Sequence, residues 1–340
     1  MPTAEKPCFA VTGRLPEPAL TLLREAGEVA VADTAAPLPR EELLAQVAGA
    51  SAIVCFLYDR VDAELLDAAG PGLRVVANVA VGYDNVDLEA AAARGLVVTN
   101  TPGVLDDATA DLTMALLLAA ARRLGEGERL IRAGRPWAWG MDFMLGRELR
   151  GKRLGIVGLG AIGGRVARRA RAFGVEIAYA NRSAAEPALV AELGAERLSL
   201  EELLAAGDFV SLHTPLTAET RGLISAERLA LMKPEAILVN TARGPVVDEA
   251  ALAAALREGT IAAAALDVYE HEPRVHPDLF ALENVVLAPH LGSATVETRE
   301  AMATLAARNA LAAVAGAPPP TPVPLPAEAQ QGPSARSRLR

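Results

Sequence analysis

Strand-like and helical segments alternate along most of the chain, and this alternation constrains the fold more than any other feature. Short β-rich runs in the first hundred residues predict four strands, at Pro7–Thr12, Ala52–Phe56, Leu73–Asn78 and Leu96–Asn100. Between them, Glu41–Val47 and Ala63–Ala69 carry leucine and alanine at helical spacing. Strands that alternate with helices build parallel sheets covered on both faces, so this half of the chain is predicted to be α/β.

A second series of the same kind begins after Thr101-Pro102-Gly103. Proline fixes its own φ and glycine permits unusual angles, so we expect a hinge there. A long Ala/Leu helix is predicted over Ala108–Arg123. Six strands are expected after it, at Leu154–Gly158, Glu176–Ala180, Asp208–His213, Ala236–Thr241, Ile261–Val268 and Asn284–Ala288. Six strands with helical connections make a complete doubly wound sheet.

The C-terminal part of the chain is expected to hold one more helix and a tail. The helix is predicted from about Val296 to Ala315, before Pro318-Pro319-Pro320. Residues 327–340 are mostly small and polar, and we expect them to be disordered.

Length and composition favour a soluble chain of two domains. The 340 residues are too many for one ordinary core, and no apolar run approaches the ~20 residues of a membrane span. The N-terminus Met1–Lys6 lacks the features of a secretory signal, and the net charge of −9 includes no basic block that would suit nucleic acid. Cys8 and Cys55 each lie in a strand-like run, as expected of free thiols in the cytoplasm, and their spacing suggests no metal site.

The sequence Gly158-Leu159-Gly160-Ala161-Ile162-Gly163 joins a predicted strand to a predicted helix that runs to about Phe173. The first glycine permits a tight turn, the second lets backbone amides approach a pyrophosphate, and the third lets helix and strand pack closely. The amino end of the helix adds N–H groups and a favourable dipole for the anion. In this setting the motif predicts a Rossmann-type dinucleotide site.

The end of the next strand bears on the choice of cofactor. An acidic residue there accepts the ribose 2′-hydroxyl of NAD, but this chain has Asn181-Arg182-Ser183 and no acid before Glu186. Arg182 can pair with a 2′-phosphate and Ser183 can donate to it. The sequence therefore favours NADP(H), with NAD(H) as the other possibility.

Three further strand ends carry groups suited to reducing a keto acid. A predicted strand runs into Thr241-Ala242-Arg243-Gly244, the next into Asp267-Val268 with Glu272-Pro273, and the last into Pro289-His290-Leu291-Gly292-Ser293. Ligands bind beyond the carboxyl ends of parallel strands, so these groups are expected to meet. Histidine titrates near neutrality and a neighbouring carboxylate favours its protonated form, which makes His290 the candidate acid/base. Arg243 supplies a cation and Glu272 the partner.

These motifs, in this order, resemble those of the D-2-hydroxyacid dehydrogenases, over roughly residues 7–323. The resemblance implies that Arg243 binds and polarises the keto acid, that His290 exchanges the proton, and that Glu272 orients and charges His290. It also implies that Asp267 holds the nicotinamide carboxamide, with Thr214, Thr241 and Ala242 as further cofactor contacts. The family's substrate loops match Leu57, which lines the pocket, and Val81 and Gly82, whose backbone amides bind the substrate carboxylate.

The same resemblance implies an arrangement of domains and of subunits. We expect a flavodoxin-like substrate domain built from residues 1–101 and 291–326, with a Rossmann domain of residues 102–290 inserted into it. A homodimer is expected, through the helix Ala108–Arg123 and an aromatic segment that contains Trp137 and Trp139.

Within the family, the segments 56–62 and 107–111 look most like glyoxylate/hydroxypyruvate reductases, which implies a small 2-keto acid as substrate. Two alternatives stay open at this point. One is a phosphoglycerate dehydrogenase, although those enzymes commonly carry a regulatory domain for which residues 317–340 leave no room. The other is a dinucleotide-sensing corepressor similar to the C-terminal-binding proteins, which can retain the catalytic residues.

Overall fold

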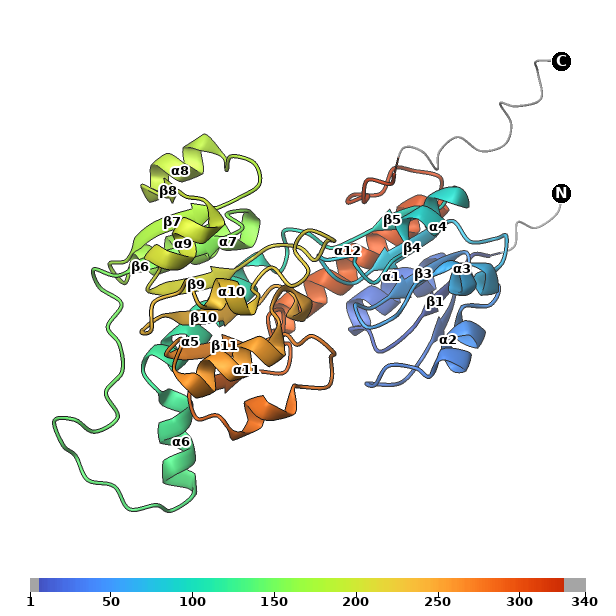
Figure 1. The fold of residues 1–340 in the computed structure, drawn as a ribbon. Helices are drawn as coiled ribbons and strands as arrows, with labels where there is room; N and C mark the ends of the chain where they lie inside the picture. The colour runs from blue at the N-terminus through green and yellow to red at the C-terminus, as the bar shows by residue number, and fades with distance from the viewer. Residues whose placement is uncertain (1–5, 327–340) are drawn as a thin grey trace, which may run out of the picture. The chain divides into compact units, whose positions relative to one another are not determined.

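The computed structural model describes residues 6–326 and divides the chain into two compact units (Figure 1). Unit 1 takes the residues up to Leu105 and those from Thr295 onward, and unit 2 takes Asp106–Ala294. Whether each unit is an independent domain with the predicted boundaries stays a prediction. The disorder expected for the tail lies outside the described residues.

Unit 1 is built on a five-stranded parallel sheet in the order β2-β1-β3-β4-β5. The strands are β1 (Cys8–Val11), β2 (Glu28–Val31), β3 (Ala52–Cys55), β4 (Val75–Asn78) and β5 (Val97–Thr99). This is the flavodoxin-like strand order. The four predicted strands are confirmed, but β2 was missed: it has only four residues, lies at the sheet edge and buries none of them.

The helices of unit 1 cover its sheet and include one from the far end of the chain. They are α1 (Glu17–Ala26), α2 (Arg40–Val47), α3 (Ala63–Ala69), α4 (Leu88–Ala93) and α12 (Val296–Val314). Helix α12 packs against α1, β3 and β4. Asn309 of α12 donates to the carbonyl of Asn100 at 3.3 Å, beside the end of β5. Helix α12 therefore belongs to the same unit as the first hundred residues.

Unit 2 is built on a seven-stranded parallel sheet in the order β12-β11-β10-β9-β6-β7-β8. The strands are β6 (Arg153–Val157), β7 (Glu176–Ala180), β8 (Glu196–Arg197), β9 (Phe209–Leu212), β10 (Ile237–Asn240), β11 (Ala263–Leu266) and β12 (Val285–Leu287). In chain order this is the Rossmann arrangement, with a seventh strand at one edge. The prediction of six strands was wrong by one, because β8 has only two residues, both exposed.

Helices lie on both faces of the seven-stranded sheet. The α-helices are α5 (Asp106–Ala121), α6 (Leu124–Arg132), α7 (Ala161–Arg171), α8 (Pro187–Leu193), α9 (Leu200–Ala206), α10 (Ala226–Leu229) and α11 (Glu249–Glu258). Two short 3₁₀ helices, η1 (Gly244–Val246) and η2 (Pro277–Ala281), complete the set.

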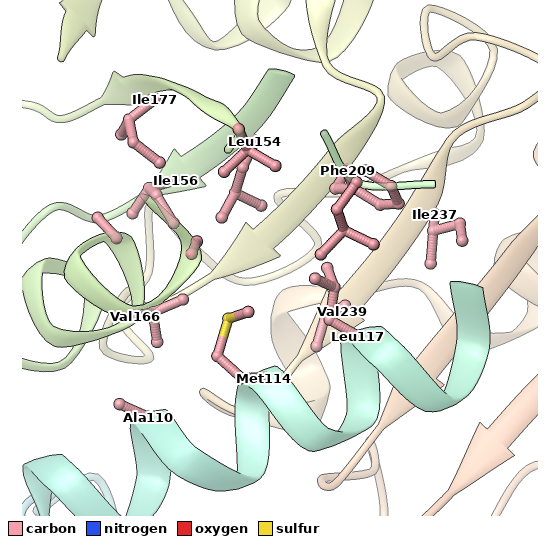
Figure 2. Packing of buried hydrophobic residues seen from close by; sticks show 14 of the residues in the cluster. Ala110, Met114, Leu117, Leu154, Ile156, Val166, Ile177, Phe209, Ile237 and Val239 are labelled. Atoms are coloured by element: carbon pink, nitrogen blue, oxygen red, sulfur yellow. The ribbon is translucent and has the colours of Figure 1, made fainter. Parts of the chain in front are cut away.

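Helix α5 forms much of the core of unit 2 on one face of the sheet. Figure 2 shows Met114 and Leu117 of α5 packed among strand residues, of which Ile156 and Val239 are fully buried. Burying one such side chain stabilises the fold by about 1.5–3 kcal/mol. Strands covered on both faces read as continuous apolar runs, which is why they could be predicted from the sequence.

One part of unit 2 packs little against this core. Helix α6 buries none of its residues, and in Figure 1 it and the segment up to β6 extend away from the sheet. Several large apolar side chains are exposed there: Leu124, Ile131, Trp137, Trp139, Met141 and Leu145. Trp137 also stacks on Phe143, with ring centroids 6.2 Å apart.

Candidate active site

The turn between β6 and α7, residues 158–163, is called the glycine turn below. Gly158 has a φ of +99°, and a Cβ there would lie 2.7 Å from the carbonyl oxygen of His213. A Cβ on Gly163 would lie 2.3 Å from the carbonyl oxygen of Gly158. A Cβ on Gly160, the residue just before α7, would meet nothing within 4 Å. The outer two glycines are thus required by the fold itself, and the middle one leaves open space at the amino end of a helix.

Residues from two neighbouring strands hold the glycine turn. Asn181, directly after β7, accepts a hydrogen bond from the Leu159 amide through Oδ1 at 2.7 Å and donates to the Leu159 carbonyl at 3.4 Å. His213, after β9, has Nε2 2.8 Å from the Ser211 hydroxyl, and burial lowers the pKa of His213 to about 3. Asn181 is expected to contact the cofactor, and its described side-chain contacts are with the turn.

Several features here fit a dinucleotide. The Thr214 hydroxyl is buried and has no hydrogen-bond partner among the described residues, so it can serve a polar group of a ligand. Leu159, Ala161 and Ile162 flank Gly160, where a Cβ would meet nothing within 4 Å. Arg182 and Ser183 are exposed. The pKa of Glu219 is lowered mainly by its hydrogen bond with Thr217 and to a smaller extent by the charge of Arg182. An arginine and a serine hydroxyl are the groups that a 2′-phosphate requires.

The turn that carries Arg243 follows β10 and is held by the last residue of that strand. Asn240 accepts from the Ala242 amide and donates to the Arg243 carbonyl, each at 3.0 Å. The Thr241 hydroxyl lies 2.8 Å from that of Thr113 on α5. These contacts fix the backbone from which the Arg243 side chain starts.

Glu272 and His290 meet after β11 and β12, with Oε2 of Glu272 2.8 Å from Nδ1 of His290. The other oxygen of Glu272 accepts from the Tyr269 amide at 3.0 Å. Burial acts to raise the pKa of Glu272, but the hydrogen bond and charge of His290, the Tyr269 amide and the charge of Arg243 outweigh it and lower the pKa. A carboxylate that stays charged beside an imidazole orients the ring and favours its protonated form.

Asp267 holds the loop on which His290 lies. It is 1% exposed, and its two carboxylate oxygens accept from the amides of Leu291 at 2.6 Å and Gly292 at 2.8 Å. Its carbonyl accepts from the His290 amide at 2.8 Å. Burial raises the pKa of Asp267. The described contacts of this carboxylate position His290, which has a φ of +54°, and differ from the nicotinamide contact that was expected.

The two loops of unit 1 expected to bind substrate are tied to each other by amide side chains. Asn85 donates to the carbonyls of Phe56 and Asp59, which flank the partly exposed Leu57, each at 3.0 Å. Asn78 donates to the Gly82 carbonyl at 3.0 Å, and Asn100 donates to the Val81 carbonyl at 2.8 Å. These contacts fix the backbone positions of Leu57, Val81 and Gly82.

Sequence reasoning missed three asparagines that hold these loops, Asn78, Asn100 and Asn240, and assigned the fourth, Asn181, to the cofactor. Asn78 and Asn240 are the last residues of β4 and β10, and Asn100 and Asn181 come just after β5 and β7. Each uses its side-chain amide to bond the backbone of a nearby loop. Asparagine at the end of a buried strand was visible in the sequence and would have identified these positions.

The described residues offer neither a membrane span nor a metal centre. No helix within residues 6–326 is long and apolar enough to cross a membrane. In the same range, no group of three or more His, Cys, Asp or Glu side chains is arranged to hold a metal ion. Cys8 and Cys55 are both free thiols.

Comparison with known proteins relates this geometry to a family. The family model for the NAD-binding domain of D-isomer specific 2-hydroxyacid dehydrogenases matches residues 114–292. The chain is 54% identical over 311 residues to a glyoxylate reductase of Thermococcus kodakarensis, an alignment that covers 90% of this chain and 93% of that protein.

Two solved structures extend the similarity to the whole fold. The TT0316 protein of Thermus thermophilus is 51% identical with a TM-score of 0.87, covering 93% of this chain and 100% of that one. A NADPH-dependent glyoxylate/hydroxypyruvate reductase of Sinorhizobium meliloti, solved with NADP and malonate, is 39% identical with a TM-score of 0.81. That alignment covers 94% of this chain and 97% of the other.

Proposed function

The chain belongs to the D-isomer specific 2-hydroxyacid dehydrogenases, and from this premise we propose that it reduces glyoxylate, hydroxypyruvate or a similarly small 2-keto acid with NADPH. The observation that carries the proposal is the 2.8 Å pair of Glu272 and His290, with Arg243 among the charges that act on Glu272. The names of the similar enzymes support the substrate class.

The chemistry divides among these side chains and the bound cofactor. The nicotinamide, when bound, supplies the hydride that attacks the keto carbon. His290 gives its proton to the carbonyl oxygen as that oxygen becomes negative, so hydride and proton together convert the ketone into a hydroxyl. Glu272 keeps the imidazole in place through its contact with Nδ1. Arg243 binds the substrate and stabilises the negative charge that develops as hydride arrives.

Other residues are assigned to binding in this proposal. The backbone amides of Val81 and Gly82 bind the substrate carboxylate, and Leu57 lines the pocket. The glycine turn binds the pyrophosphate, with Thr214, Thr241, Ala242 and Asp267 completing the cofactor site. The buried, unpartnered hydroxyl of Thr214 supports this assignment. Asp267 is assigned to the nicotinamide carboxamide, in addition to the amides of Leu291 and Gly292 that its carboxylate accepts from.

NADPH is proposed as the preferred cofactor. Arg182 and Ser183 are exposed at the carboxyl end of β7, and no carboxylate there would accept a ribose 2′-hydroxyl. The similar enzyme of Sinorhizobium meliloti is NADPH-dependent.

A cytoplasmic homodimer is proposed as the working form. Trp137, Trp139 and Met141 are each more than half exposed, on a segment that leaves the core of unit 2. Large exposed apolar patches mark sites of association, and a second copy of this chain is the partner proposed. The two free thiols support a reducing compartment.

A substrate panel with both cofactors tests the proposal. The purified protein is expected to oxidise NADPH rapidly with glyoxylate and hydroxypyruvate, and slowly with 3-phosphohydroxypyruvate. Preferred turnover of the phosphorylated acid would identify a phosphoglycerate dehydrogenase. Tight cofactor binding without turnover of any short 2-keto acid would contradict the proposal and favour a dinucleotide-sensing role.

A further inference from the structure

A buried carboxylate outside the reaction machinery holds both ends of the loop that presents Glu272. This residue is Glu249, the first residue of α11, which is 4% exposed. One of its oxygens accepts a hydrogen bond from the Glu270 amide, and the other accepts from the His276 amide at 3.2 Å. Glu270 and His276 bracket Glu272 in the chain, so a single side chain closes the loop that carries it.

Other contacts also restrict the loop held by Glu249. Its first peptide, between Tyr269 and Glu270, lies against Gly244, where a Cβ would come within 1.8 Å of the Tyr269 carbonyl carbon. The Tyr269 phenol donates to the Ala288 carbonyl at 2.8 Å and so ties the start of the loop to the end of β12. Within the loop, the Arg274 amide donates to the His271 carbonyl at 2.9 Å. The backbone on either side of Glu272 is therefore fixed, and Glu249 holds it from outside the loop.

The residue type at this position is informative. Both partners of Glu249 are N–H donors, and a carboxylate is the side chain that offers two acceptor oxygens and no donor. A glutamine of the same shape would keep one acceptor but set its NH₂ against the second N–H. A buried N–H without an acceptor is costly, so the loop would move to find one.

We propose that Glu249 is a positioning residue for the reduction: by holding the amides of Glu270 and His276 it keeps the Glu272 carboxylate against Nδ1 of His290. This inference rests on the proposed function, because its effect on turnover passes through Glu272 and His290. Glu249 itself touches neither substrate nor cofactor in this account.

The first test compares Glu249→Gln with Glu258→Gln, which makes the same change at the exposed last residue of the same helix. Glu249→Gln is expected to lower kcat roughly tenfold, the effect of one lost hydrogen bond on a transition state, and to leave the KM for NADPH unchanged. Above its pH optimum its activity should fall at a lower pH than that of the wild type, because a displaced Glu272 carboxylate favours a charged imidazole less. Glu258→Gln should behave as wild type. Equal behaviour of the two variants would overturn the proposal.

A double-mutant cycle separates positioning from general stability. If Glu249 acts through Glu272, then Glu249→Gln should add little to the loss caused by Glu272→Gln, because no carboxylate remains to be positioned. If the fold-loss of kcat in the double variant equalled the product of the two single losses, the proposal would be overturned, because Glu249 would then act independently of Glu272.

A second pair of variants avoids any change to α11. His276 has a φ of −58°, which proline can adopt, so His276→Pro removes the amide donor without straining that residue. His276→Ala removes the imidazole but keeps the amide. The proline variant should show the lower kcat. Equal kcat values for His276→Pro and His276→Ala would count against the role of the His276 amide as a contact of Glu249.

Amide hydrogen exchange distinguishes this inference from the proposed function. In the wild type the amides of Glu270 and His276 should exchange slowly, and in Glu249→Gln they should exchange faster while the amides of β11 do not change. That result stands whatever keto acid the protein reduces. Fast exchange of both amides in the wild type would refute the positioning role of Glu249 and leave the proposed function intact. Absence of turnover together with slow exchange would refute only the proposed function.

Discussion

The glycine turn after β6 and the loop after β11 both follow the carboxyl ends of strands in the seven-stranded sheet, but their shapes are fixed by different kinds of contact. The turn is shaped from within, because Gly158 has a positive φ and Gly163 lies too close to the Gly158 carbonyl to carry a side chain. The loop is shaped from outside, by the Glu249 carboxylate and by the backbone of Gly244. The turn requires glycines among its own six residues, with Asn181 as a further support, whereas the loop is held by residues more than twenty positions away.

The largest effect is expected at the loop's catalytic contact. His290→Ala removes the proton donor while the glycine turn is untouched, so kcat should fall by about 10²–10⁴-fold with NADPH affinity unchanged. Steady-state kinetics and a fluorescence titration with NADPH measure the two quantities. A variant that kept wild-type kcat would remove His290 from the reaction.

Two substitutions separate the folding and binding roles of the glycine turn. Gly163→Ala places a Cβ 2.3 Å from the Gly158 carbonyl, so it should cost about 1–3 kcal/mol of stability and also weaken NADPH binding. Gly160→Ala meets nothing within 4 Å and should leave stability within about 0.5 kcal/mol of wild type, yet weaken binding where the pyrophosphate approaches. Thermal unfolding and NADPH titration measure both. Wild-type NADPH affinity in Gly160→Ala would mean that the pyrophosphate does not approach the backbone at Gly160.

The sequence predicted the turn far better than the loop. Sterically required glycines beside an apolar strand form a short local pattern, so Gly158–Gly163 and the buried strands were found directly. Glu249 was not found, because its role depends on hydrogen bonds to backbone amides that only the fold brings near. Strands β2 and β8 were missed because they are short edge strands, of four and two residues, and none of these residues is buried.

The chemistry of the end of β7 can be tested apart from both the turn and the loop. A charge-assisted contact to the 2′-phosphate is worth ~1.5–3 kcal/mol, so Arg182→Ala should raise the KM for NADPH by roughly 10- to 100-fold and leave that for NADH nearly unchanged. Arg168→Ala, at an exposed arginine paired with Glu192 on α8, serves as the control. Preference of the wild type for NADH, or equal weakening of both cofactors by Arg182→Ala, would end the phosphate assignment.

The smallest effect concerns the support behind the glycine turn and depends on pH. Burial lowers the pKa of His213 from 6.5 to about 3, so below pH 6.5 the unfolded chain binds a proton that the folded chain does not. Stability from this group is therefore complete above pH 6.5 and falls as the pH is lowered towards 3. Because part of His213 reaches solvent, the free energy of unfolding should fall by less than the full shift implies, by about 1–2 kcal/mol between about pH 7 and pH 5. Urea unfolding of wild type and His213→Gln measures it, and the same pH slope in both proteins would contradict it.

The stereochemistry of hydroxypyruvate reduction tests the central claim most directly. Protein saturated with NADPH is given hydroxypyruvate, and the glycerate formed is resolved on a chiral column beside the product of a His290→Ala control. We expect D-glycerate in amounts equal to the NADPH consumed, with little product from the variant. Formation of L-glycerate, or no glycerate from protein shown to bind NADPH, would contradict the assignment of this chain as a D-specific reductase of small 2-keto acids.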